Sequence, residues 1–285
     1  MPRWQQRRER LRSVLFGTQC VYPGSVFDPI SARIAEELGF EIGMFAGSIA
    51  SLTVLGAPDL ILLTLTEFAE QAHRICRAGN LPLLCDADHG YGNALNVMRT
   101  VEELETAGVA GLSIEDTELP AAFGGKQPRL ISIEEGIGKM RAALAARRDT
   151  ALVIAGRTSS PVINGIADTI ERARAYEAAG VDAIFLVGLK SRADLDAVAA
   201  QVKLPLILGG AGKELMDRDW LAGRGVRICL QGHQPFTAAV RAIHDTLRAL
   251  RDGVPPEAIG ALASDETMKR LTGTADYARW MKDWL

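Results

Sequence analysis

Two carboxylates and a histidine end an apolar run in the segment LLCDADHGYGNA, residues 83–94. Side chains alternate across a strand, so Asp86 and Asp88 project to one side and Cys85 and Ala87 to the other. Two like charges this close repel each other unless a positive group lies near them. The spacing therefore indicates a cation at the end of this strand. The alternative is that the Asp-x-Asp pair forms an Asx turn or caps a helix.

Short apolar runs alternate with amphipathic helical patterns along the chain, an order typical of parallel strands joined by helices. We expect strands near residues 20–22, 42–47, 82–87, 109–114, 152–157, 183–188, 205–209 and 226–231. Eight such strands predict an α/β fold, a (β/α)8 TIM-type barrel. The barrel with an N-terminal helix is expected to form one domain, residues 1–249, followed by a C-terminal helical extension, residues 250–285.

The ends of several helices are marked by local sequence signals. Two pairs have the spacing of a capping box and two glycines are expected to end helices: Thr64 with Glu67, Ser132 with Glu135, Gly108, and Gly180. The N-terminal WQQRRERLRSVL is Arg-rich, as transit peptides are, but its apolar residues fall near helical spacing. We therefore expect a surface helix there with one apolar side.

In such barrels the reactive groups come from the C-terminal ends of the strands, where the βα loops converge. The candidates at these ends are Ser48, Asp86, Asp88, Glu115, Arg157 and His233. The three acidic residues offer only oxygen ligands, which favours a hard cation such as Mg²⁺, with Mn²⁺ as the alternative. Because Mg²⁺ keeps several waters, we expect Asp86 to bind it directly and Asp88 and Glu115 to hold metal-bound waters.

Composition argues against several classes of protein. The 285-residue chain has a formal net charge of −3 and no sustained basic stripe, so we expect no nucleic-acid partner. No apolar run approaches the roughly 18 residues of a membrane span, and the N-terminus lacks the apolar core of a secretory signal. The four cysteines show no CxxC spacing and are expected to be reduced, buried thiols. A cytoplasmic protein that binds a small molecule and no membrane is the expected class.

The segments AGSIAS, DADHGYGNALNVMRTVEELETAG, SIED and GRT, in this order, resemble the isocitrate lyase and phosphoenolpyruvate mutase superfamily. Within it, SVFDPISARIAEELGF, DHGYGNALNVMRTVEELE and QGHQPFTAAV are most similar to the oxaloacetate decarboxylase branch. The resemblance implies Mg²⁺ in the barrel mouth at Asp86 and substrate binding by Ser48, Arg157 and His233. It also implies a homotetramer, a dimer of dimers, in which a C-terminal helix is exchanged between neighbouring subunits.

The expected activity is that of a carboxy-lyase: Mg²⁺-dependent decarboxylation of oxaloacetate, or a close 2-oxo-diacid, to pyruvate and CO₂ through an enolate that the cation stabilises. Ser48 would hold the C1 carboxylate, Arg157 would fix it and stabilise the enolate, and His233 would contact the departing end or help to protonate C3. Three alternatives stay open: a C–C lyase acting on a 2-alkylmalate or a methylisocitrate-like acid, a phosphonomutase, and a barrel that binds an organic acid without turnover.

The loop ELPAAFGGKQPRL, residues 118–130, separates these alternatives. Lyases of the superfamily use a Cys on this loop as an acid, whereas here the ionisable groups near the centre are Lys126 and Arg129. Two further segments depart from the family pattern. The seventh strand ends in LGGAG, where many relatives place a polar or aromatic side chain, and the fifth continues as GRTSS rather than ARTNA.

Single residues also have structural alternatives. Ser48 could cap the next helix, and Arg157 could form a structural bridge to Glu115 or its neighbour. His233 could be satisfied by the backbone. His89, inside the DHGYGN turn, is expected to fix that turn through its ring.

Overall fold

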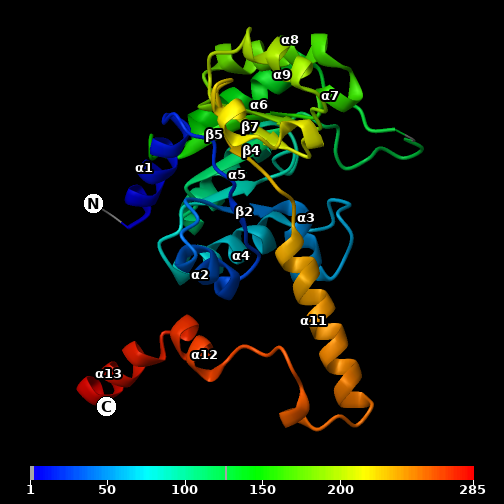
Figure 1. The fold of residues 1–285 in the computed structure, drawn as a ribbon. Coiled ribbons are helices and arrows are strands. Elements are labelled where there is room, and N and C mark those ends of the chain that lie inside the picture. Colours follow the sequence, from blue (N-terminus) through cyan, green and yellow to red (C-terminus); the bar gives the residue numbers. More distant parts are fainter. Residues whose placement is uncertain (1–2, 126) are drawn as a thin grey trace.

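Eight parallel strands, paired in sequence order, form the centre of the computed structural model, which describes residues 3–125 and 127–285 (Figure 1). They are β1 (Gly24–Ser25), β2 (Gly43–Ala46), β3 (Leu83–Asp86), β4 (Gly111–Glu115), β5 (Val153–Thr158), β6 (Ala183–Val187), β7 (Leu206–Gly209) and β8 (Val226–Cys229). Val21 joins the two ends of the sheet through a parallel bridge to Ile228. Its N–H donates to Arg227 O at 2.9 Å, and Cys229 N–H donates to Val21 O at 3.0 Å. The predicted (β/α)8 barrel is confirmed.

The first strand is the element that the sequence reasoning placed wrongly. Residues 20–22 contribute only the bridge at Val21, whereas the residues that pair with β2 are Gly24 and Ser25. Pro23 has no N–H to donate, so it separates the two pairings. The other seven strands begin and end within two residues of the predicted bounds.

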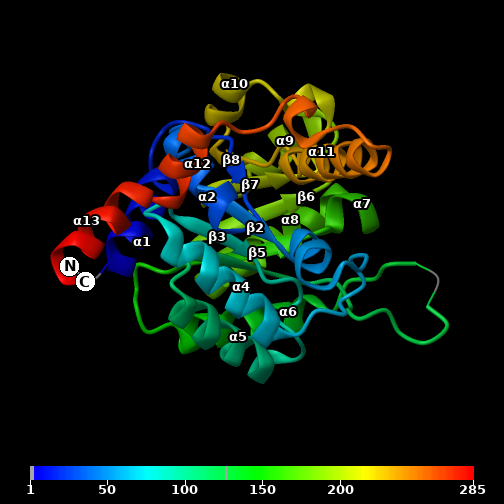
Figure 2. The same cartoon turned by 90° about the horizontal axis from the view of Figure 1, so that it is seen from below.

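Helices connect the strands and cover the outside of the barrel, with α4, α5 and α6 side by side in both views (Figure 2). The helices up to β8 are α1 (Arg3–Leu15), α2 (Pro29–Glu37), α3 (Gly47–Ala50), the π-helix η1 (Ser51–Leu55), α4 (Leu65–Ala78), α5 (Ala94–Ala107), α6 (Ile133–Ala146), α7 (Ser160–Ile163), α8 (Ile166–Ala179), α9 (Arg192–Ala199), the 3-10 helix η2 (Lys213–Leu215) and α10 (Arg218–Ala222).

The predicted helix ends agree with the structure, with one difference. The Thr64–Glu67 box at the start of α4 has both of its hydrogen bonds. Ser132 caps α6 by accepting the N–H of Glu135, which is half of the predicted box. Gly108 and Gly180 end α5 and α8 in the left-handed conformation that glycine adopts without strain.

Alternation along the strands fills the barrel interior with apolar side chains. The inward set is Val21, Ile42, Met44, Ala46, Leu84, Ala110, Val153, Ala155, Ala183, Phe185, Ile207 and Ile228. Leu11 and Leu15 of α1 join it, and Leu11 lies against Gly111, the first residue of β4. The predicted N-terminal helix therefore exists, and its apolar side closes the barrel end opposite the C-terminal strand ends. Two residues beyond Leu84 and Ala155, the same alternation turns Asp86 and Arg157 into the barrel mouth.

The chain leaves the barrel through α11 (Gln234–Arg251), and none of its residues, all of which the structure describes, is buried. Figure 1 shows this helix running away from the barrel. The 3-10 helix η3 (Pro256–Ala258), α12 (Asp265–Thr272) and α13 (Thr274–Trp284) follow. α12 returns to α2, where Arg270 Nη2 lies 2.9 Å from Glu37 Oε1 and Arg33 donates to Leu271 O at 2.5 Å.

Two expectations from composition concern the whole fold. The four cysteines, all within the described residues, are free and buried, as predicted. Among the helices of the described residues, none is at once long and apolar enough to cross a membrane.

Candidate active site

The C-terminal ends of β3, β4 and β5 surround a cavity of about 210 Å³. Its polar side chains are Ser48, Asp59, Asp86, Asp88, Glu115 and Arg157. Five of the six predicted site residues therefore meet in one cavity. The volume is below the roughly 300–1,000 Å³ of pockets for drug-sized ligands, and it suits a small polar molecule.

Arg157 joins two of the carboxylates. Asp86 ends β3 and Glu115 ends β4, where Glu115 is the register partner of Arg157. Arg157 Nη1 donates to Asp86 Oδ2, and its Nη2 lies 3.3 Å from Glu115 Oε2. The ion-pair alternative for Arg157 is thus realised with Glu115, whereas Asp116 pairs with Arg172, and the pair with Asp86 was not predicted. Because the guanidinium also lines the cavity, this pairing is compatible with a contact to an anionic ligand.

Two hydroxyls complete the hydrogen bonding of these acids. Ser113 Oγ donates to Asp86 Oδ1 at 3.0 Å, and Thr117 Oγ1 donates to Glu115 Oε2 at 2.8 Å. Ser113 is the register partner of Asp86 on β4, so the sheet itself brings this pair together. The carboxylates of Asp86 and Glu115 are consequently each held in one orientation by a hydroxyl and by the guanidinium of Arg157.

Asp88 is positioned by a turn rather than by the strand. Its φ of 47° is left-handed, a conformation that costs a non-glycine residue on the order of 1–3 kcal/mol and that Asp tolerates better than most. Its carboxylate lies against Gly47 of α3, where an added Cβ would be 2.4 Å from Asp88 Oδ2. Neither Asp86 nor Asp88 caps a helix, because the cap of α5 is Asn93.

The charges of the cavity fit a divalent cation. Burial, and then Asp86 and Glu115, raise the pKa of Asp88 well above its usual range. Burial also raises the pKa of Glu115, although Arg157 acts in the opposite direction. The four carboxylates of Asp59, Asp86, Asp88 and Glu115 thus line the cavity with the guanidinium of Arg157, and a divalent cation would offset much of the remaining negative charge.

The arrangement of the acids indicates how many would bind a cation directly. In residues 3–125 and 127–285, no three His, Cys, Asp or Glu side chains converge as a ready ligand cage. Mg²⁺ does not need one, because it usually binds one or two carboxylates and keeps several waters. The donor set therefore fits Mg²⁺ with few direct protein ligands.

His233 lies beside this cavity and is held by two hydroxyls. Its Nδ1 is 2.8 Å from Ser25 Oγ, and its Nε2 is 3.4 Å from Ser48 Oγ. His233 and Ser25 also line a separate cavity of about 110 Å³. The hydrogen-bond partners of the His233 ring are side chains, so the alternative that backbone groups bind the ring is wrong. Burial lowers the pKa of His233, against the opposing effect of Asp86 and Asp59, so the ring is neutral at neutral pH.

Ser48 does not cap the helix that contains it. The N-cap of α3 is Ala46, which has no side-chain capping bond, and Ser48 lies in the first turn. The capping alternative is therefore wrong. The hydroxyl of Ser48 is instead placed between the main cavity and His233.

Asp59 and Ser25 are the polar residues of this region that the sequence reasoning missed. Asp59 lies in the long connection between η1 and α4, and burial, followed by Asp86, raises its pKa. Asp59 does not follow a strand directly, because the loop after η1 returns to the mouth further along the chain. The length of the β2–α4 loop could have indicated that one of its residues reaches the site, because βα loops build the sites of such barrels.

The glycines of LGGAG accommodate an aromatic ring from the neighbouring strand. A Cβ on Gly209 would lie 2.8 Å from Phe185 Cε2. The Phe185 ring is in turn 5.6 Å from the guanidinium carbon of Arg157, within the range of a cation–π contact. Phe185 thus takes the space of a larger side chain on β7 and supports Arg157 from below.

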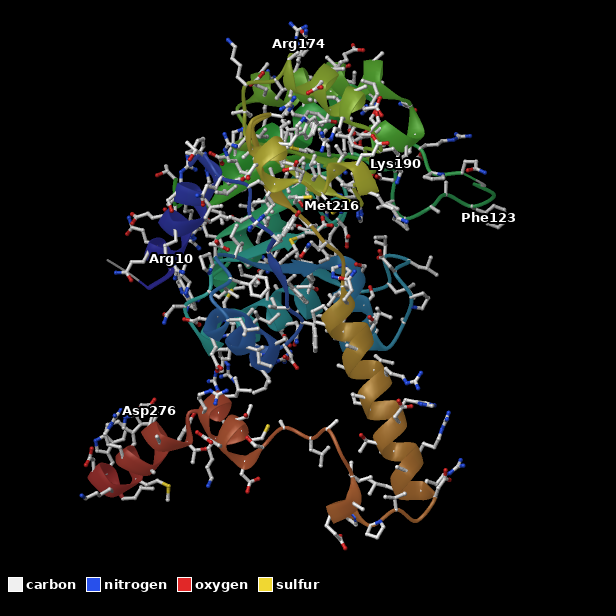
Figure 3. The ribbon with its side chains drawn as sticks, in the orientation of Figure 1. Arg10, Phe123, Arg174, Lys190, Met216 and Asp276 are labelled. Carbon is white, nitrogen blue, oxygen red and sulfur yellow. The ribbon has the colours of Figure 1, made fainter. Side chains whose placement is uncertain are left out.

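The loop after β4 is anchored at its base. Thr117 forms an antiparallel bridge with Leu130, and Glu118 N–H donates to Arg129 O at 2.8 Å. Phe123 is fully exposed and lies far out on the projecting loop (Figure 3). Lys126, which the sequence offers as an ionisable group near the centre of this loop, lies outside the described residues.

The barrel is that of the PEP mutase/isocitrate lyase superfamily, because a 2,3-dimethylmalate lyase of this superfamily superposes on it with a TM-score of 0.85 at 25% identity, covering 99% of each chain. The family model for phosphoenolpyruvate phosphomutase matches residues 12–251. The chain belongs to this family.

Individual relatives resemble the chain over nearly its whole length. An oxaloacetate decarboxylase of Bradyrhizobium diazoefficiens is 62% identical over 273 residues, which are 96% of this chain and 95% of that protein. A phosphonopyruvate hydrolase solved with oxalate and Mg²⁺ has a TM-score of 0.87 at 28% identity, covering 98% of this chain and 99% of the other. An oxaloacetate acetylhydrolase solved with 3,3-difluorooxalacetate has a TM-score of 0.85 at 29% identity, covering 98% and 97%.

Gly47→Ala is predicted to displace the Asp88 carboxylate, because the new Cβ would lie 2.4 Å from it. We expect Mn²⁺ to bind at least about tenfold more weakly, the effect typical of a lost group behind the direct ligands. Electron paramagnetic resonance of free Mn²⁺ measures this affinity. Gly138→Ala on α6, where an added Cβ meets nothing within 4 Å, is the control and should bind as the wild type does. Equal affinities for the two variants would contradict the prediction.

Proposed function

We propose that this protein is a Mg²⁺-dependent oxaloacetate decarboxylase, a carboxy-lyase that converts oxaloacetate, or a close 2-oxo-diacid, to pyruvate and CO₂. The observation that carries the proposal is the meeting of Asp86, Glu115 and Arg157 in a small cavity beside Ser48. It occurs in a chain 62% identical to an oxaloacetate decarboxylase. Two structural neighbours were solved with oxalate and Mg²⁺ or with 3,3-difluorooxalacetate, both of them small dicarboxylates like the proposed substrate.

In this proposal Asp86 binds the cation directly, while Asp88 and Glu115 hold its waters, and Mn²⁺ can replace Mg²⁺. A divalent cation bound there would withdraw electron density from the C2 keto group of the substrate and so favour loss of CO₂. The three acids supply the negative charge that retains the cation. Arg157 limits their repulsion when the cation is absent.

The protein's own residues then bind the substrate and control its charge. Ser48 donates to the C1 carboxylate, together with neighbouring backbone N–H groups. As the C3–C4 bond breaks, its electron pair moves toward the keto group, and Arg157 supplies positive charge where the negative charge develops. Losing one such preorganised donor typically raises the barrier by about 3 kcal/mol.

His233 is assigned a second role, from its place beside Ser48 at the edge of the cavity. It is neutral and its Nε2 lies near Ser48, so in one tautomer it can donate a hydrogen bond toward the cavity side of that hydroxyl. From this position we propose that it contacts the departing carboxylate or assists protonation of C3. Ser25 holds Nδ1 and thereby keeps the ring in place.

A C–C lyase acting on a 2-alkylmalate-type acid is the second candidate, since a 2,3-dimethylmalate lyase superposes with a TM-score of 0.85 at 25% identity. Cleavage of that kind leaves a carbanion that needs a placed acid. The segment 118–130 contains no Cys to serve as one. Decarboxylation makes a smaller demand, because CO₂ leaves without assistance and water can protonate the product.

The purified protein with Mg²⁺ is predicted to accelerate the loss of oxaloacetate, and to leave isocitrate and 2-methylisocitrate uncleaved. Pyruvate formation coupled to NADH oxidation measures the first reaction. Glyoxylate and pyruvate release from the two tricarboxylates measures the second. Efficient cleavage of the tricarboxylates without any acceleration of oxaloacetate loss would overturn the proposal in favour of the lyase.

Asp86→Ala is predicted to abolish turnover while leaving the barrel folded, because Glu115 still pairs with Arg157. Excess EDTA should abolish the activity of the wild type, and added Mg²⁺ should restore it. The matched control is Asp196→Ala, which removes an exposed partner of Arg224 and should keep full activity. Full activity of Asp86→Ala, or of the EDTA-treated wild type, would exclude the metal mechanism.

We also propose a cytoplasmic homotetramer, a dimer of dimers, in which α11 is exchanged between neighbouring subunits. The cytoplasm is the compartment in which four free thiols stay reduced. α11 carries four exposed apolar residues, Val240, Ile243, Leu247 and Leu250. An apolar groove of about 960 Å³ lies between α2 and the start of α11. The α11 helix of a neighbouring subunit would cover this apolar surface. The proposed domains are the barrel, residues 1–249, and the C-terminal extension, residues 250–285.

Sedimentation equilibrium is predicted to give the mass of four chains. Ile243→Glu with Leu247→Glu should lower that mass, because each change buries a carboxylate in the proposed interface. Arg174→Glu, an exposed change on α8 at the far side of the barrel from α11 (Figure 3), is the control and should remain tetrameric. A monomeric wild type would overturn the proposed assembly and leave the proposed activity standing.

A further inference from the structure

Lys139 is a buried cation that the proposed mechanism does not use. It lies on α6 with 3% of its surface exposed, and its ammonium donates to the carbonyl oxygen of His89 at 2.9 Å. Burial lowers its pKa, while Glu135, Glu115 and Asp116 act to raise it. A buried ammonium is unfavourable unless it is paired and hydrogen-bonded, so its position beside the cavity requires a reason.

The carbonyl that Lys139 binds belongs to an unusual turn, residues 87–92. Its φ angles are left-handed at Asp88 (47°), Gly90 (78°), Tyr91 (61°) and Gly92 (146°). Two of these four residues are not glycine. Backbone of this kind persists only where its surroundings over-determine it, and it clusters at functional sites.

A second side chain holds the next carbonyl of the same turn. Thr100 of α5 is fully buried, and its Oγ1 lies 3.0 Å from the carbonyl oxygens of both Gly90 and Asn96. The carbonyls of His89 and Gly90 are thus held by side chains from two different helices. We call Lys139 and Thr100 the clamp.

The ring of His89 is a separate feature of the turn from its clamped carbonyl. Its Nδ1 is buried and has no hydrogen-bond partner among the described residues. Burial, and then Lys139, lower the pKa of His89 to about 4, so the ring is neutral. That the ring fixes the turn stays a prediction, because its centroid lies 6.1 Å from that of Tyr91 in the same turn, while the main-chain carbonyl of His89 provides the attachment point for Lys139.

We propose that Lys139 and Thr100 are positioning residues, which clamp the 87–92 turn so that Asp88 is aimed at the divalent cation. The inference rests on the metal site of the proposed function. Asp88 precedes the two clamped carbonyls, its own carbonyl accepts Glu115 N–H at 2.8 Å, and its carboxylate packs against Gly47. Release of either clamped carbonyl lets the turn relax toward ordinary φ values, and the carboxylate then leaves its place.

The charge of Lys139 adds a second effect that Thr100 lacks. The ammonium lies near Glu115 and Asp116 and offsets part of the negative charge behind the cavity. Lys139→Met removes the charge and the hydrogen bond together, whereas Thr100→Val removes a neutral hydrogen bond with little change of shape. Lys139→Arg keeps the charge and a donor.

The test measures Mn²⁺ affinity, the Mg²⁺ concentration that gives half-maximal activity, and thermal unfolding for each variant. We expect Lys139→Met to bind Mn²⁺ about 10–100-fold more weakly, the range typical of groups that orient metal ligands, and Thr100→Val to weaken binding in the same direction. Lys139→Arg should recover much of the loss. At saturating Mg²⁺ the kcat of Thr100→Val should approach that of the wild type. Lys203→Met, at an exposed lysine, is the control.

The outcomes are distinguishable. Wild-type Mn²⁺ affinity in folded Lys139→Met and Thr100→Val, with only a lower melting temperature, would overturn the clamp and leave the metal site intact. If Lys139→Met does not fold, Thr100→Val decides alone, because unchanged Mn²⁺ affinity in it means that the turn does not aim Asp88. Asp86→Ala is the reference that should bind no Mn²⁺. If the wild type also binds none, both the metal site and the clamp are overturned.

Discussion

The accumulation of negative charge at the barrel mouth is the constraint on which the rest of the structure depends. Asp86, Asp88 and Glu115 share a small cavity, where their repulsion is stronger than it would be in water. Arg157 pairs with two of them, but removing charged groups from water offsets much of the stability that such pairs supply. The site therefore adds little to the free energy of unfolding, and the rest of the barrel has to supply the stability.

The barrel meets this demand by holding Asp86, Glu115 and Arg157 through neighbouring strands. Strand register sets Ser113 against Asp86 and Arg157 against Glu115, and Phe185 lies beneath the guanidinium. The ring of strands is closed at Val21, and the apolar side of α1 fills its far end. Because closely packed interiors resist deformation, these side chains cannot separate to relieve their repulsion. The divalent cation of the proposed function would relieve it instead.

How far the sequence predicts this arrangement follows from the range of the interactions. Strand alternation and the rule that reactive groups lie at C-terminal strand ends are local arguments, and they bring Asp86, Glu115 and Arg157 together. The bond between Ser25 and His233 joins residues far apart in sequence and has no local signal. The first strand was misplaced because Pro23 divides its pairing between two neighbours, which apolar character alone does not reveal. Lys139 escaped notice because a lysine on a helix is ordinarily exposed.

His233 connects the chemistry of the site to the architecture beyond it. It is the N-cap of α11, and only the start of that helix is attached to the barrel, where Phe236 meets Phe27 with ring centroids 5.3 Å apart. The remainder of α11 buries no residue of its own within the protomer described here. The ring of His233, in contrast, is held by the hydroxyls of Ser25 and Ser48. Two short hydroxyl side chains thus hold the histidine beside the cavity at the point where the chain leaves the barrel.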